Sequence, residues 1–104
     1  MALRNQYSSD VEGGAPVQFR YAIAGRLHVP DFLDFIAERA LWLNISGWAS
    51  ARDDHSVTLV AAGPEALVGA LEMACTLGPL NALVEAVDWV VEPGPVAAGF
   101  TIRR

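Results

Sequence analysis

The stretch ISGWASARDDHSVTLVAAGP, residues 45–64, decides the fold of this chain. Its two halves, residues 45–52 and 56–62, have the composition of strands, and the polar run at 53–55 is typical of a tight connection. We therefore predict a β-hairpin. The Gly-Pro pair at 63–64 then predicts that the second strand gives way to a helix.

A helix also precedes the hairpin. Pro30 and Asp31 suit its first turn, because proline tolerates the first helical position and a carboxylate there complements the helix dipole. Asn44 suits its end, because asparagine adopts the left-handed conformation that stops a helix. In between, apolar residues recur at steps of three and four, which places them on one face for burial. They are Phe32, Ile36, Ala40 and Leu43.

A strand lies upstream of this unit and a second helix lies downstream. Apolar residues alternate with others over residues 17–23, which predicts a strand that Gly25 closes or bends. After the hairpin, the helix that opens at 63–64 extends to a second Gly-Pro pair at 78–79, a usual helix stop. Its predicted buried stripe comprises Leu67, Leu71, Ala74 and Cys75.

Two more strands complete the pattern. Residues 82–91 change apolar phase near Ala86, which predicts a β-bulge, and residues 100–102 form a short last strand. The order β-α-β-β-α-β, with a fifth edge strand, predicts an α+β ferredoxin-like sandwich, in which an antiparallel sheet carries two helices on one face. We assign residues 16–104 to this one domain and the polar residues 1–15 to a flexible N-terminal tail.

Composition excludes several classes of function. The chain is 53% apolar, which indicates an ordered core, and its net charge of −5 would repel a nucleic-acid backbone. No apolar run could cross a bilayer and residues 1–15 hold no secretory signal, so we expect a cytoplasmic protein without membrane contact. One cysteine, Cys75, and two histidines form neither a disulfide nor a zinc cluster, so we expect no metal and no cofactor.

From Gly25 to Pro64 the chain resembles the acylphosphatase family. The family pattern reads G-R-V-Q-G-V-x-F-R, then x-F-V-x-x-x-A-x-x-L-G-L-x-G-W-V-x-N, then D-G-S-V-x-V-x-A-x-G-P, and the spacing agrees without an insertion. Residues 100–102 match the closing F-x-I of the family. The resemblance implies the sandwich fold predicted above. The matching residues are Gly25, Arg26, Phe32, Phe35, Ile36, Ala40, Gly47, Trp48, Asp54, Ser56, Val57, Gly63 and Pro64.

The resemblance also implies a catalytic site, and here the sequence departs from the family. In the family an arginine grips the phosphoryl group together with backbone amides, and an asparagine positions the attacking water. Leu33 and Ala51 stand at those two positions and offer no donor. In the loop before the helix, Pro30 has no amide hydrogen, and Asp31 and Asp34 add negative charge where a phosphate would lie.

We therefore expect a non-catalytic acylphosphatase-like domain that acts as a binding or interaction module. Its partner would be a second copy, another protein or a small-molecule ligand. Edge strands and Trp42, which lies off the buried stripe of the first helix, offer surfaces for such association. The candidate ligand-loop residues are Arg26, His28, Val29, Pro30, Asp31 and Phe32.

Two alternatives stay open. The first is a weak or altered acylphosphatase that hydrolyses acyl phosphates, with Arg26 and His28 supplying positive charge in place of the missing pair. The second is a regulatory ligand-binding domain, which depends on fold analogy alone. The other histidine, His55, stands where the family has glycine, and we expect it to be an exposed turn residue.

Overall fold

The computed structural model describes residues 14–104, so all but the last two residues of the predicted tail lie outside the described part of the chain. The elements follow the predicted order. No helix in residues 14–104 is long and apolar enough to cross a membrane. The elements are β1 (Pro16–Arg26), α2 (Val29–Trp42), β2 (Ser46–Asp53), β3 (Ser56–Pro64), α3 (Glu65–Leu77), β4 (Leu83–Val91) and β5 (Phe100–Arg103).

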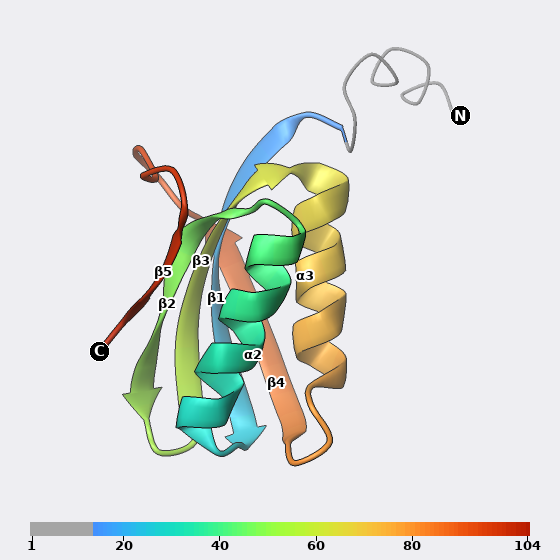
Figure 1. The fold of residues 1–104 in the computed structure, drawn as a ribbon, viewed down its shortest axis with the longest axis vertical. Helices are drawn as coiled ribbons and strands as arrows, with labels where there is room; N and C mark the ends of the chain where they lie inside the picture. The colour runs from blue at the N-terminus through green and yellow to red at the C-terminus, as the bar shows by residue number, and fades with distance from the viewer. Residues whose placement is uncertain (1–13) are drawn as a thin grey trace.

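The strands form one sheet in the order β4-β1-β3-β2-β5, and both helices cover the same face of it (Figure 1). β1 and β3 lie inside the sheet and pair antiparallel with each other. β4 joins β1 and β2 joins β3, both antiparallel, whereas β5 pairs with β2 in parallel. The predicted ferredoxin-like sandwich is confirmed. Only the short last strand departs from an antiparallel sheet.

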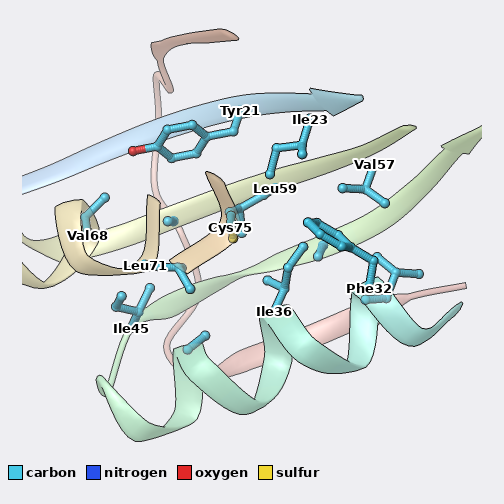
Figure 2. Packing of buried hydrophobic residues seen from close by; sticks show 14 of the residues in the cluster. Tyr21, Ile23, Phe32, Ile36, Ile45, Val57, Leu59, Val68, Leu71 and Cys75 are labelled. Carbon is cyan, nitrogen blue, oxygen red and sulfur yellow. The ribbon is translucent and has the colours of Figure 1, made fainter. Parts of the chain in front are cut away.

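The core lies between the sheet and the two helices (Figure 2). Phe32, Ile36 and Ala40 of the first predicted stripe are buried, as are Leu71 and Cys75 of the second. Removing these apolar side chains from water is the main favourable contribution to folding. The other stripe residues, Leu43, Leu67 and Ala74, are partly buried.

The ends of α2 are built as the sequence predicts. The helix begins at Val29, one residue before Pro30. His28 occupies the N-cap position with an extended backbone, and its side chain makes no capping hydrogen bond. It ends at Trp42, and Asn44 then takes a left-handed φ of 55°. These ends place the loop at residues 27–28 at the start of the helix, next to the end of β1.

A bulge in β4 shapes the edge of the sheet beside that loop. Ala24 pairs with Ala86 but Gly25 pairs with Val84, so Glu85 is the extra residue. β1 therefore continues past Gly25 instead of closing there. A side chain at Gly25 would lie 2.2 Å from the carbonyl oxygen of Leu83, so this close approach requires glycine.

Candidate functional site

The candidate site is the loop that joins β1 to α2, together with the first turn of that helix. The amide of Phe32 donates to the His28 carbonyl at 2.9 Å and closes the first helical turn. The earlier amides of a helix have no partner within it, so those of Val29 and Asp31 lack a partner inside α2. Pro30, between them, offers no hydrogen.

The structure brings His28 and Asp31 together. His28 Nδ1 lies 3.1 Å from Asp31 Oδ2, and both side chains are exposed. Asn81, in the turn before β4, donates from Nδ2 to the same carboxylate oxygen at 3.1 Å. Sequence analysis missed Asn81, because it lies far along the chain and no local pattern connects it to the loop. Asp31 therefore contacts residues from two separate segments of the chain.

Arg26 is the cation of this loop. It is the last residue of β1, pairs with Leu83 in the sheet and has an exposed side chain. It makes no salt bridge with any residue in the described range 14–104. By the alternation along β1, in which Tyr21 and Ile23 are buried, its side chain starts from the face of the sheet that the helices leave uncovered.

Three residues of the predicted site belong to the core instead of the surface. Val29 and Phe32, both predicted as ligand-loop residues, are buried under α2. Leu33, at the position implied for the family arginine, is only 4% exposed. The Leu33 side chain packs into the core. The site therefore has a buried apolar side chain at the position where the family resemblance implies a guanidinium.

Ala51 lies near the same end of the molecule. It follows the buried Ala49 by two residues along β2, so both side chains are on the helix-covered face of the sheet. Gly25 N donates to His55 O at 3.0 Å, which ties the β2–β3 hairpin to the end of β1. Figure 1 shows the end of β2 and the start of α2 at one end of the domain.

The hairpin turn itself has a structural explanation. Asp53 Oδ1 accepts hydrogen bonds from the backbone of His55 at 2.8 Å and from the Ser56 hydroxyl at 2.9 Å. These bonds lower the pKa of Asp53, the one from the His55 backbone most. His55 is exposed in this turn, as expected.

Fold and loop together define the class of protein: a small α+β sandwich with a helix N-terminus and an unpaired arginine at the end of its first strand. Comparison with known proteins gives the family. The sequence profile of the family Acylphosphatase matches residues 19–102. The chain belongs to the acylphosphatase family.

Individual relatives agree with this assignment. An acylphosphatase of Rhizorhabdus wittichii is 38% identical over 85 residues, which cover 76% of this chain and 86% of the relative. One from Salinibacter ruber is 34% identical over 96 residues, covering 90% of this chain and 100% of the relative. Among solved structures, the Bacillus subtilis acylphosphatase matches with a TM-score of 0.77 and 25% identity, over 85% of this chain and 99% of that one.

These relatives confirm the predicted family and correct the predicted function. We expected a non-catalytic binding module from the residues at two positions, Leu33 and Ala51. Relatives that are 31–38% identical over most of this chain are instead named acylphosphatases. That name describes an enzyme that hydrolyses acyl phosphates. The prediction of a non-catalytic module is therefore wrong, because it weighed two positions above the similarity of the whole chain.

Proposed function

We propose that this chain hydrolyses acyl phosphates at the β1–α2 loop, as an acylphosphatase with an altered site. The observation that carries the proposal is its similarity, over nearly its whole length, to the Salinibacter ruber acylphosphatase. The altered part is the presence of Leu33 and Ala51 where the family resemblance implies arginine and asparagine. We expect the reaction to take place in the cytoplasm.

Phosphate binding in this proposal uses groups that the loop supplies. The amides of Val29 and Asp31 donate to the phosphoryl oxygens, and the dipole of α2 favours the negative charge. Arg26 adds a guanidinium that no described residue engages. The Asp31 carboxylate opposes binding, but His28 and Asn81 both contact it.

Hydrolysis adds water at phosphorus and breaks the bond between phosphorus and the acyl oxygen. The products are a carboxylate, inorganic phosphate and the proton lost by water. A carboxylate is a good leaving group, so the reaction needs little help from a general acid. The contact of His28 Nδ1 with Asp31 favours the tautomer that carries its hydrogen there. Nε2 is then free to accept the proton of the water.

The rate should reflect the missing donors. Removing one well-placed donor from an oxyanion site costs about 100- to 1,000-fold in rate. Leu33 and Ala51 provide none, so we expect turnover above the uncatalysed reaction but below that of a variant in which both donors are restored. The low rate follows from positioning and charge stabilisation, which phosphoryl transfer depends on.

The test is hydrolysis of benzoyl phosphate by the unmodified protein and three variants. We expect His28→Ala to lower the rate at least about tenfold, since general acid–base catalysis typically contributes ~100-fold or more. Leu33→Arg/Ala51→Asn should raise the rate above that of the unmodified protein. His55→Ala is the matched control, because this exposed histidine lies in the hairpin turn.

The outcomes separate the parts of the proposal. No turnover by the unmodified protein would overturn the proposed activity. Equal rates for His28→Ala and His55→Ala would remove His28 from the site and leave the activity in place. Because Leu33 is buried, thermal unfolding of the Leu33→Arg/Ala51→Asn variant must be recorded beside its rate.

A further inference from the structure

A groove runs along the outer surface between α2 and the end of α3, apart from the β1–α2 loop. The two helices lie side by side over the sheet in Figure 1. The groove has a volume of about 460 Å³, within the usual range for small-molecule sites. Its lining is apolar except for one cation. The lining residues are Phe35, Arg39, Ala74, Leu77, Gly78, Pro79 and Leu80.

Arg39 lacks an acceptor in this groove. Its Nε is buried and has no hydrogen-bond partner among residues 14–104, and its side chain makes no salt bridge in that range. The guanidinium carbon lies 5.0 Å from the centre of the Phe35 ring and 4.9 Å from that of Trp42. Aromatic faces stabilise a cation, but they leave the N–H without an acceptor. The buried Nε is closed to a ligand as it is to water, so the groups that can meet a ligand in the groove are the terminal nitrogens of the guanidinium, which have no salt-bridge partner in that range.

The rim of the groove is unusually apolar for a water-exposed surface. Trp42 is 68% exposed, Leu77 is 74% exposed and Leu80 is fully exposed. Large apolar side chains that gather in the open typically mark a binding site. A ligand that covers them needs an apolar body, and Arg39 requires that this body carry an acceptor.

The charges nearby limit the acceptor to a single anionic group. On α2, the exposed Glu38 directly precedes Arg39, and the exposed Asp31 lies one helical turn before Phe35. The whole chain has a net charge of −5. Polyanions such as an acidic peptide or an anionic membrane would meet these carboxylates, whereas a ligand with one carboxylate would meet only Arg39.

We propose that this groove binds a small carboxylic acid with an aromatic or branched aliphatic body. The carboxylate accepts hydrogen bonds from the terminal nitrogens of the Arg39 guanidinium, and the body packs on Phe35, Leu77 and Leu80. A charge-assisted bond to arginine supplies the orientation, and burial of apolar surface supplies most of the affinity. The site is separate from the β1–α2 loop and does not depend on the proposed hydrolysis.

The experiment is a titration of the full chain with sodium phenylacetate, followed by amide chemical shifts in NMR. We expect shifts at Phe35, Arg39 and residues 74–80. Arg39→Met should raise the dissociation constant at least about tenfold, because a hydrogen bond to a charged group is lost. Arg52→Met, at an exposed residue near the β2–β3 turn, removes an equal charge elsewhere and should leave binding unchanged.

A second comparison keeps the test independent of the variant's folding. Phenylacetamide has the same ring without the charge, and it should bind the unmodified protein at least about tenfold more weakly than phenylacetate. Equal affinity for the acid and the amide, or shifts confined to residues 26–33, would overturn the proposal. Tighter binding of an acidic, leucine-rich peptide than of phenylacetate would also overturn it, in favour of a protein partner.

Discussion

At the scale of single residues, neighbours in the site loop have opposite environments. His28 is exposed and contacts Asp31, whereas Leu33, five positions later, is almost fully buried. The first belongs to the surface that would meet a substrate, and the second belongs to the core. A residue at position 33 therefore affects both chemistry and packing, and changes there must be measured for both.

Tyr21 offers a clean test of a single polar contact in the core. Its ring is buried, and its hydroxyl donates to Glu72 Oε1 on α3 at 3.0 Å. Tyr21→Phe keeps the ring and removes the bond. We expect the free energy of unfolding in urea to fall by about 1 kcal/mol, since hydrogen bonds contribute roughly 0.5–1.5 kcal/mol and those to charged groups more.

The partner variant makes this prediction specific. Glu72→Gln keeps an acceptor without the charge, so it should cost less than Tyr21→Phe. The double variant should cost less than the sum of the two single changes, because they remove one interaction. Strictly additive losses would show that the hydroxyl stabilises the fold by some other contact.

At the scale of elements, close contact between strands decides which positions must be glycine. Gly47 in β2 has a φ of 141°, and a side chain there would lie 1.9 Å from the carbonyl oxygen of Val60 in β3. Its amide also donates to Gly99 O at 2.9 Å, next to β5. This glycine therefore holds β2 against both of its neighbours.

We predict opposite effects for two glycine-to-alanine changes. Gly47→Ala should destabilise the domain by about 3 kcal/mol or more, because β2 must move away from β3. Gly69 lies on an exposed part of α3. In Gly69→Ala the new methyl group would have nothing within 4 Å. It should stabilise the helix by roughly 0.5–1 kcal/mol. Chemical denaturation of both variants measures this, and equal stability of Gly47→Ala and the unmodified protein would contradict it.

At the scale of the whole molecule, two buried acids couple stability to alkaline pH. Burial raises the pKa of the Cys75 thiol to about 12. Burial, with a smaller contribution from Glu72, also raises the pKa of Tyr21. Both groups therefore keep their protons in the folded state at pH values where the unfolded chain releases them.

The sign of the effect follows from this difference. The stabilising contribution of Cys75 is complete below about pH 8.5, the ordinary pKa of an unfolded cysteine, and is lost as the pH rises towards 12. We expect the free energy of unfolding to fall by up to about 1.4 kcal/mol per pH unit above that point for this one group. Urea titrations at several pH values measure the slope. Cys75→Ala should make the slope shallower, and an unchanged slope would contradict the assignment.

The local pattern of the sequence was sufficient for the elements and their order. Alternation predicted β1, the three- and four-residue steps predicted the buried stripe of α2, and Asn44 marked its end. These features depend on backbone preference and on which side faces the core, and both are written in neighbouring residues. The family resemblance was equally visible, since it depends on spacing along one continuous stretch.

Contacts between distant residues were decided only by the tertiary structure. Asn81 meets Asp31, Glu85 becomes the extra residue of the bulge, and Arg39 faces the end of α3 because the fold brings separate segments together. No local pattern encodes such pairs, since each depends on how whole elements pack. Fold and family thus follow from neighbouring residues along the chain, whereas the site and the groove depend on how distant segments pack together.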